Sequence, residues 1–512
     1  MWRLHDPQCN EAEKVMWDIV PYTRGRGIDV GCGRFKAFPH FIGVDNGHHW
    51  GREGIDVVSE ADDLELFASE SLDFVFSSHA LEHIADFKGA LREWWRVLKV
   101  GGHLSLYLPH KELYPNIGSD HGNKDHKHDF LPQDIIDAMR DIGSWELGVN
   151  ERRDHDNGEG SRGNEYSFFQ VYRKTESGQK IIEKVAHKKT CAVVRYGGFG
   201  DMIVLSSILP GLKAQGYHIT IFTTPRGHDI LRHDPHVDAF MLQDTDQVPN
   251  NKLGDFWKHH KAKYDKWVNL SESVEVTSLA FPGTTAFNWS HAARNLFFDK
   301  NYIEVTHAIA EVPMPAKAKF YPTPEETAWA KAERAKMGET VVLWSISGSA
   351  VHKRYSKMDR VMMMVLTTRP EVEFVLIGDE LCQLLEAGWE NEKRVHCRSG
   401  KWSIRETLAF ANECDLVVGP ETGVLNSVGM EEVPKVCMLS HSSEQNLMKH
   451  WKNAVALTPD NTPCFPCHQM HYGFETCKEV KEVGCAQCQE DIRAEDVFLA
   501  IVQRTDKMTK AA

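Results

Sequence analysis

Short runs of apolar and β-branched residues alternate with longer amphipathic segments in three stretches of the chain. The first stretch covers residues 25–174 and contains a long predicted helix at 82–99. Its predicted strands are 27–31, 41–45, 72–78 and 103–109, followed by 145–154 and 164–174 around a polar hairpin turn at 155–163. This alternation is typical of parallel α/β units.

The α/β pattern resumes twice after a polar segment without apolar periodicity, which predicts a linker at 176–189. The strands predicted there are 190–196, 218–224, 238–243 and 266–270 in one lobe, and 340–347, 373–379, 415–420 and 434–440 in the next. We therefore expect a domain at 1–175 and two lobes at 190–325 and 326–512. Ligands of open α/β sheets bind beyond the carboxyl ends of the strands, so both lobes should direct loops into one cleft.

Composition narrows the class of protein. A chain of 512 residues exceeds what one hydrophobic core supports, and 42% hydrophobic residues with no low-complexity tract predict a folded protein. The net charge of −14 argues against stable binding of nucleic acid. The pattern includes no signal peptide or membrane span, and most cysteines stand singly, which predicts a cytoplasmic location in which peripheral membrane association remains open.

A glycine turn and an acidic strand end mark the first candidate site. Gly31 and Gly33 follow the strand 27–31, where a missing side chain lets the backbone approach a ligand, and Asp45 ends the next strand. A carboxylate there can accept hydrogen bonds from both ribose hydroxyls. The absence of a full GxGxxG argues against a dinucleotide.

The stretch from Gly27 to Pro109 resembles the class I S-adenosylmethionine-dependent methyltransferases, which have a Rossmann-like fold. The resemblance implies S-adenosylmethionine as the cofactor. Its contacts would be Asp29, Gly31 and Gly33 at the methionine end, Asp45 at the ribose, Glu60 and Ala61 at the adenine, and His79 near the sulfonium. Only nine residues separate Gly33 from Gly43, so we expect the first helix to be very short.

Histidines and aspartates crowd the segment that follows. A metal site could be drawn from them, but no pair has a recurring ligand spacing, so we favour a solvated loop over the acceptor pocket. The residues concerned are His110, His121, His126, His128, Asp120, Asp125 and Asp129.

The second candidate site begins with Asp201, which follows a glycine turn at the start of a helix and could be an ordinary helix cap. The opposite lobe offers Lys353 and Arg354 after a strand, a combination suited to a diphosphate. Further candidate contacts lie at strand ends of the same lobe, either through polar side chains or through backbone amides at a helix start: Asp379, Glu380, Thr422 and Gly423. Cations and helix termini there favour an anion.

Residues 191–502 resemble glycosyltransferase family 9, the heptosyltransferases, which implies a GT-B pair of Rossmann-like lobes and a nucleotide-diphosphate sugar as donor. Asp201 would be the base of an inverting, metal-independent displacement. The donor contacts would be Gly200, Lys353, Arg354, Asp379, Glu380, Glu421, Thr422 and Gly423. Glu421 and Asn426 stand where the family often has aspartate and histidine, so the donor sugar can differ from heptose. Should Asp201 be structural, Glu272 and Glu275 are the next candidates for the base.

Five cysteines gather near the C-terminus. Two CxxC pairs separated by seventeen residues fit a four-cysteine structural zinc site, although unliganded structural cysteines or cysteines paired with one another fit equally well. The predicted ligands are Cys464, Cys467, Cys485 and Cys488.

The sequence thus predicts a bifunctional transferase of surface-glycan or lipopolysaccharide-type biosynthesis, acting on a glycan or glycolipid acceptor. One alternative is a single active module with the other serving as a scaffold. A nucleic-acid-modifying enzyme is a second alternative, and a lectin-like binding protein is a third, which the phosphate-directed residues disfavour.

Overall fold

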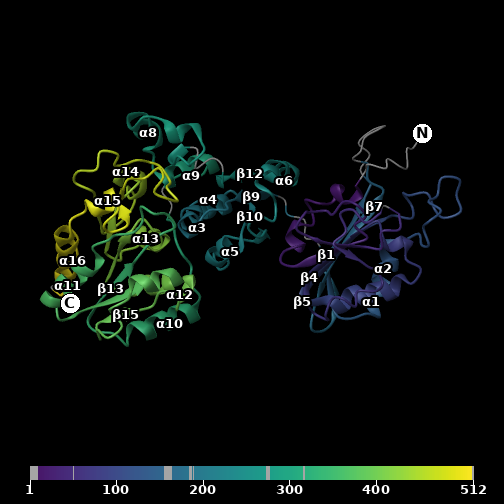
Figure 1. Ribbon diagram of the computed structural model, residues 1–512, viewed down its shortest axis with the longest axis horizontal. Coiled ribbons are helices and arrows are strands. Elements are labelled where there is room, and N and C mark those ends of the chain that lie inside the picture. The colour runs from purple at the N-terminus through teal and green to yellow at the C-terminus, as the bar shows by residue number, and fades with distance from the viewer. Residues whose placement is uncertain are drawn as a thin grey trace. The chain divides into compact units, whose positions relative to one another are not determined.

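A computed structural model describes residues 10–49, 51–154, 164–183, 187, 189–271, 277–314 and 317–509 (Figure 1). The chain divides into two compact units. Unit 1 comprises Met1–Lys188 and Leu242–Lys263, and unit 2 comprises Lys189–Met241 and Tyr264–Ala512. The predicted hairpin turn at 155–163 and the candidate bases Glu272 and Glu275 lie outside the described residues.

Unit 1 is built on an eight-stranded sheet of order β3-β2-β1-β4-β5-β7-β6-β8. The strands are β1 Gly27–Val30, β2 Ile42–Asp45, β3 Val57–Val58, β4 Leu72–Ser78, β5 Leu98–Pro109, β6 Trp145–Arg153, β7 Ser167–Lys174 and β8 Gln179–Ile181. The first five run parallel, and β7 is antiparallel to both β5 and β6. This Rossmann-like sheet confirms the predicted fold class. Residues 31–41 form turns rather than a helix.

The long helix predicted at 82–99 is shorter in the structure. It begins as α1 at Phe87–Val97, because the Asp86 side chain caps it by accepting a hydrogen bond from Gly89 N at 2.9 Å. Residues Leu81–His83 form a separate 3-10 turn, η3, and Ile84 is extended. Glu82 and His83 therefore leave the helix and precede its cap. The second helix of the unit is α2, Pro132–Arg140.

A segment from the second α/β stretch completes unit 1. Residues 242–263 carry η4, Asn250–Lys252, and α6, Leu253–Lys261. Phe256 is buried with its ring 6.0 Å from Trp17, and Gln247 Nε2 donates to Val20 O at 2.7 Å. Asp18 accepts from His259 Nε2 at 2.9 Å and pairs with Lys263 and, at 3.0 Å, with Arg153 Nη2. The sequence pattern does not predict this insertion, nor that part of 176–189 would form the edge strand β8.

The first lobe of unit 2 has a four-stranded sheet of order β11-β10-β9-β12. Its strands are β9 Thr190–Val194, β10 His218–Thr223, β11 Ala239–Leu242 and β12 Lys266–Asn269. Its helices are α3 Phe199–Ser206, α4 Leu209–Ala214, α5 Pro225–Leu231, α8 His291–Phe298 and α9 Tyr302–Ala310.

The second lobe has a six-stranded parallel sheet of order β15-β14-β13-β16-β17-β18, the doubly wound order of dinucleotide-type folds. Its strands are β13 Thr340–Ser345, β14 Val372–Ile377, β15 Val395–Cys397, β16 Leu416–Pro420, β17 Lys435–Met438 and β18 Ala454–Leu457. Its helices are α10 Pro324–Arg334, α11 Met358–Thr368, α12 Ile404–Ala411, α13 Gly423–Gly429, α14 Glu444–Leu447, α15 Gln487–Glu490 and α16 Ala494–Thr509.

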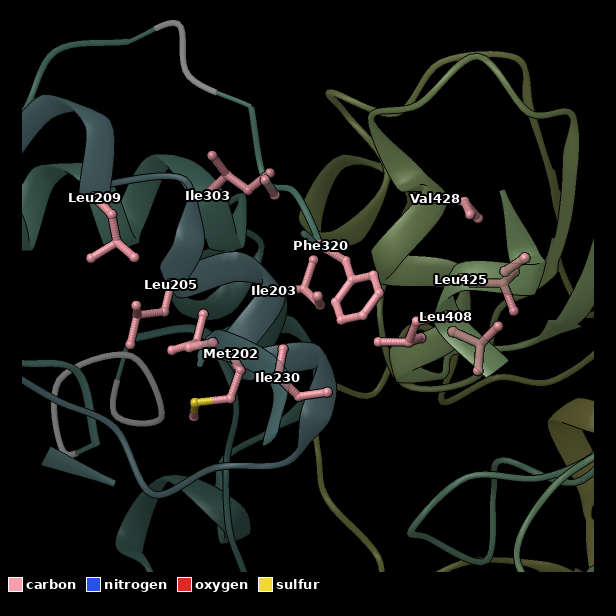
Figure 2. Close-up of a cluster of buried hydrophobic side chains, with 14 of the residues drawn as sticks. Met202, Ile203, Leu205, Leu209, Ile230, Ile303, Phe320, Leu408, Leu425 and Val428 are labelled. Atoms are coloured by element: carbon pink, nitrogen blue, oxygen red, sulfur yellow. The ribbon is translucent and has the colours of Figure 1, made fainter. Parts of the chain in front are cut away.

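One hydrophobic core joins the two lobes of unit 2. Figure 2 shows Ile203 of α3 beside Phe320, with Leu408 and Leu425 of the second lobe on its other side. All four side chains are at most 3% exposed. This core packs α3 against α13 and so fixes the first turn of one helix against that of the other. In the part of the chain that the structure describes, no helix combines the length and the apolar character of a membrane span.

Candidate active sites

In unit 1, the glycine turn after β1 lies at the point where the strand order reverses. Gly31 and Gly33 have φ of 74° and 54°, a left-handed conformation that suits glycine. A Cβ atom at Gly31 would lie 2.3 Å from Ala80 Cβ, so this turn directly contacts the loop that follows β4. The turn and the loop thus share one edge of the sheet, where Rossmann-like folds bind ligands.

Two aspartates hold this turn in place. Asp45 accepts hydrogen bonds from Gly33 N at 3.0 Å and from Gly47 N at 2.8 Å, one on each carboxylate oxygen. Each oxygen keeps a lone pair, so the carboxylate can still bind a diol. Asp29 is buried and accepts from Ala37 N at 2.8 Å, and burial raises its pKa to about 7.

The residues predicted for the adenine lie beyond Asp45. Glu60 is exposed and accepts from Asn46 Nδ2 at 3.0 Å, while the Ala61 carbonyl is held by Trp94 Nε1 at 2.7 Å. Trp94 is fully buried in α1. The core helix therefore positions the Ala61 backbone, and Asn46 links the Glu60 side chain to the end of β2.

His79 follows β4 and faces a carboxylate that the sequence analysis did not single out. Its backbone has φ of 49°, which is strained for a histidine, and its Nε2 is 2.8 Å from Ser167 Oγ. Its Nδ1 lies 3.9 Å from Glu82 Oε1. Burial lowers the pKa of His79 to about 4 and raises that of Glu82 to about 8. Glu82 and His83 are visible in the sequence as candidate ligands. Because the sequence analysis placed them in a long helix, it did not predict that their side chains would face His79.

Part of the interpretation of the histidine-rich segment as a solvated loop is wrong. His121 is exposed as expected, but His126 is only 6% exposed and its Nε2 lies 3.9 Å from Glu82 Oε1. The reason is local: the amides of Lys127 and His128 donate to the Glu82 carbonyl at 2.8 and 3.2 Å, which draws the segment onto the η3 turn. Tyr114 stacks on His126 at 5.3 Å between ring centroids.

In unit 2, the first turns of α3 and α13 meet. A Cβ atom at Gly423 would lie 3.0 Å from Gly200 N, and one at Gly200 would lie 2.5 Å from Asn426 Nδ2. A side chain at Gly423 would press on the Gly200 backbone, so this close approach favours glycine there. The contact brings the acidic turn of one lobe next to the Glu421–Thr422–Gly423 motif of the other.

Asp201 is both a helix cap and an ion-pair partner. Its Oδ2 accepts from Gly198 N at 2.6 Å, and its Oδ1 lies 2.7 Å from Arg195 Nη2. The Asp201 side chain is 41% exposed, whereas that of Arg195 is 5% exposed and also donates to Leu270 O at 2.7 Å. Arg195 was missed in the sequence because it stands at the end of an apolar strand.

Glu421 is buried in a dense set of hydrogen-bond donors. Its Oε1 accepts from the amides of Ser440 and Ser442 at 2.7 and 3.1 Å, and its other oxygen pairs with His441 Nδ1. Burial alone would raise the pKa of Glu421, but His441, Lys353 and the Ser440 amide hold it below its usual range. The Glu421 carboxylate is thus used to position a loop.

Thr422 and Lys353 are neighbours across Gly348. A Cβ atom at Gly348 would lie 2.9 Å from Lys353 Cδ and 3.5 Å from Thr422 Cγ2. The Thr422 hydroxyl is 3.1 Å from Ser345 Oγ at the end of β13. These side chains stand at the carboxyl ends of β13 and β16, where this strand order reverses.

The other predicted donor contacts have structural partners. Arg354 Nη1 donates to Gly484 O at 3.1 Å, which ties it to the cysteine-rich segment. Asp379 caps the 3-10 turn η6, Glu380–Leu385, by accepting from Cys382 N at 3.1 Å. Glu380 is exposed on the first residue of that turn. Among the predicted donor residues, Gly200 and Gly423 form the α3–α13 contact, Thr422 directly precedes Gly423, and Lys353 adjoins Thr422.

The cysteines near the C-terminus are all free thiols, and they differ in their burial and in their neighbours. Cys485 Sγ faces Glu490 Oε2 at 3.8 Å, whereas the Cys488 thiol has Cys467, Cys477 and Cys464 among the neighbours that, after burial, raise its pKa. Cys477, which the two CxxC pairs leave out, therefore belongs with this group. Among the described residues, no three cysteine Sγ atoms lie within 4.8 Å of one another.

Comparisons with known proteins find one family profile and one curated relative. Residues 28–106 match a family profile described as a methyltransferase domain. An uncharacterized protein of Methanocaldococcus jannaschii is 29% identical over 137 residues, which are 24% of this chain, and the match spans 65% of that relative's length.

Solved structures resemble separate parts of the chain. A family 9 glycosyl transferase from Veillonella parvula is 15% identical, with a TM-score of 0.46, over 62% of this chain and 97% of its own. The ADP-heptose lipopolysaccharide heptosyltransferase II of E. coli is 13% identical, with a TM-score of 0.44, over 63% of this chain and 100% of its own. An S-adenosylmethionine-dependent methyltransferase from Thermotoga maritima is 20% identical, with a TM-score of 0.26, over 32% and 94%.

Proposed function

We propose that the protein is a bifunctional transferase whose unit 1 moves a methyl group from S-adenosylmethionine. The methyltransferase profile over residues 28–106 supports this, as does the geometry around Gly31, Gly33 and Asp45. Asp45 would hold the ribose hydroxyls, and Glu60 with Ala61 would border the adenine. The sulfonium would lie toward His79.

Unit 2 is proposed to transfer a sugar from a nucleotide-diphosphate donor. Asp201 would take the proton of the acceptor hydroxyl while that oxygen forms a bond to the anomeric carbon. The bond from that carbon to the diphosphate oxygen breaks at the same time, with inversion, and the nucleoside diphosphate leaves. Lys353 and Thr422 would stabilise the departing diphosphate without a metal ion. A glycan or glycolipid acceptor, in surface-glycan or lipopolysaccharide-type biosynthesis, suits this reaction.

The observation that carries the glycosyl-transfer proposal is the meeting of α3 and α13. It brings the helix of the half-exposed Asp201 carboxylate against the helix that follows Thr422, and Lys353 adjoins Thr422. The test is a thermal-shift screen of the full chain with nucleotide sugars, followed by single-turnover transfer with the best donor. A donor that binds raises Tm, and the stabilisation grows with the logarithm of its concentration over Kd. If no nucleotide sugar raises Tm while S-adenosylmethionine does, unit 2 is a scaffold and unit 1 alone is an enzyme.

An apolar patch on α8 supports peripheral membrane association. Leu296 is 89% exposed and Phe297 is 40% exposed, and together with Trp289 they line a shallow hollow. Lys300 lies over the Phe297 ring, 4.6 Å from its centroid, and provides a cation at the same place. Exposed aromatic and apolar groups beside a cation suit an anionic bilayer surface. Loss of binding to anionic vesicles in Leu296→Glu, with binding retained in Leu499→Glu, is the expected result.

We also propose structural zinc in the cysteine-rich segment. The ligands would be Cys464, Cys467 and Cys488 of the predicted set together with Cys477, because Cys477 contributes to the raised pKa of Cys488 whereas Cys485 faces Glu490. Four thiolates suit a tetrahedral zinc ion. The thiols would have to close around the ion on binding.

A further inference from the structure

Unit 1 contains a buried carboxylate without a hydrogen bond. Glu82 is fully buried, and neither of its side-chain oxygens has a hydrogen-bond partner. A buried carboxylate left this way costs several kcal/mol of folding free energy, so such groups are normally paired or bound to a metal. Within the described residues, the ion-pair distances recorded for Glu82 all lead to imidazole nitrogens.

Three histidines converge on one oxygen of this carboxylate. Oε1 of Glu82 lies 3.8 Å from His83 Nε2, 3.9 Å from His126 Nε2 and 3.9 Å from His79 Nδ1. These separations are too long for hydrogen bonds. Two ligands bound about 2.1 Å from one metal ion at a tetrahedral angle are roughly 3.4 Å apart, and wider angles lengthen that separation. The separations of 3.8–3.9 Å between the histidine nitrogens and Glu82 Oε1 are therefore closer to the spacing of two ligands of one metal ion than to a hydrogen bond.

The cluster is also preorganised by backbone contacts. The Glu82 carbonyl accepts two amides of the 127–128 segment, which fixes His126 beside it, and the His83 and His126 rings pack edge to face at 4.7 Å. Within the described residues, the ligand atoms of Glu82, His83 and His126 all lie within 4.8 Å of one another. His79 adjoins this set from the strained end of β4.

We propose that Glu82, His83 and His126 bind a divalent first-row transition-metal ion, with His79 alongside. Two imidazoles and one carboxylate suit Zn²⁺ or Mn²⁺ better than Mg²⁺ or Ca²⁺, which prefer oxygen ligands alone. Three protein ligands leave coordination positions open, as catalytic sites do.

The place of the site assigns it to the methyl acceptor. Ala80 touches the Gly31 turn, and His79 to His83 follow it, so the ion would stand beside the methyl donor's pocket. An acceptor hydroxyl bound to the ion would release its proton to water more readily, and its oxygen would then form a bond to the methyl carbon as the carbon–sulfur bond breaks and the thioether leaves. This assignment rests on the proposed methyl transfer and names its acceptor class as a metal-binding hydroxyl.

The experiment uses the full chain, stripped with a chelator and then titrated with Zn²⁺, Mn²⁺ or Mg²⁺. Zn²⁺ and Mn²⁺ should raise Tm and bind at this site with one equivalent, and Mg²⁺ should have little effect at the same concentration. Glu82→Gln should abolish this binding, whereas His121→Asn, an exposed histidine of the same segment, should not change it. Because Co²⁺ bound to thiolates absorbs strongly in the near ultraviolet, cobalt loading separates this nitrogen and oxygen site from the cysteine-rich segment.

A second measurement, the Tm of metal-free protein, distinguishes a metal site from a structural contact. In metal-free protein, Glu82→Gln replaces a buried carboxyl that has no partner with an amide that cannot ionise, so its Tm should equal or exceed that of the parent chain. The parent should become the more stable of the two only when metal is added. Unchanged Tm and no bound Zn²⁺ or Mn²⁺ at Glu82 would overturn the proposal, and S-adenosylmethionine binding measured in parallel would show whether the methyl-donor site itself is intact.

Discussion

Replacing Asp201 separates a catalytic base from a helix cap. In Asp201→Asn the side-chain oxygen can still accept from Gly198 N, so the cap survives, and the loss is the ion pair with Arg195. Because Asp201 is 41% exposed, that pair stabilises the fold by at most about 1 kcal/mol. Asp201→Ala also removes the capping bond, which adds about 1 kcal/mol.

The effect of both substitutions on the rate of sugar transfer should be larger than their effect on stability. The two variants should also rank differently in rate than in stability. Neither variant can accept the acceptor proton, so both should lose about 100-fold in single-turnover rate, which equals about 2.7 kcal/mol of activation free energy. The rates of the two variants should agree within a few-fold although Asp201→Ala is the less stable protein. Donor affinity should be nearly unchanged in both.

The assay is single-turnover transfer at a temperature well below the Tm of each variant, with donor affinity measured by titration. Chemical unfolding of the same preparations gives the stability order. If Asp201→Asn keeps its rate while Asp201→Ala loses it, the rate follows the cap, and Asp201 is structural. The search for the base would then move to other carboxylates of unit 2.

Four further results are expected. Asp45→Ala should weaken S-adenosylmethionine binding at least tenfold by calorimetry with glycosyl transfer unchanged, and Asp45→Asn, which keeps an acceptor for the Gly33 amide, should lose less. Lys353→Ala should lower both donor affinity and single-turnover rate about tenfold, since its cation would face the diphosphate before and during transfer. A Cys477→Ser variant should lose one equivalent of zinc by elemental analysis, and retained zinc there with loss in Cys485→Ser would restore the original pairing. Asp18→Ala should cost about 3 kcal/mol in chemical unfolding and speed hydrogen exchange over α6, because the side chains of Arg153, His259 and Lys263 lose a shared hydrogen-bond acceptor.

The sequence predicts the strands far better than the direction of individual side chains. The apolar runs of β1, β4, β13 and β16 are recognisable because buried parallel strands are continuously hydrophobic. The meeting of Gly200 and Gly423 is a tertiary contact between residues far apart in the chain, and no local pattern specifies it. The prediction of a helix from Glu82 onward was wrong because the Asp86 side chain caps the helix and makes it begin at Phe87.

The metal cluster and the insertion show the same limit. Glu82 and His126 lie 44 positions apart, and only the folded loop brings the acid and the imidazole together. The segment 242–263 has ordinary helical patterning, so its sequence indicates α6 but not the unit against which Phe256 packs. Long-range placement of this kind depends on packing that propensity and periodicity do not encode.

The insertion also means that the chain passes between the two units three times, after residues 188, 241 and 263. A single cut or stop codon near residue 188 would release a fragment of unit 1 without α6, with the Trp17 side of its core uncovered and Asp18 deprived of two partners. Recombination at one junction therefore cannot transfer either unit intact, and their abundance in the cell is locked at one to one. The two proposed activities are therefore inherited and expressed together.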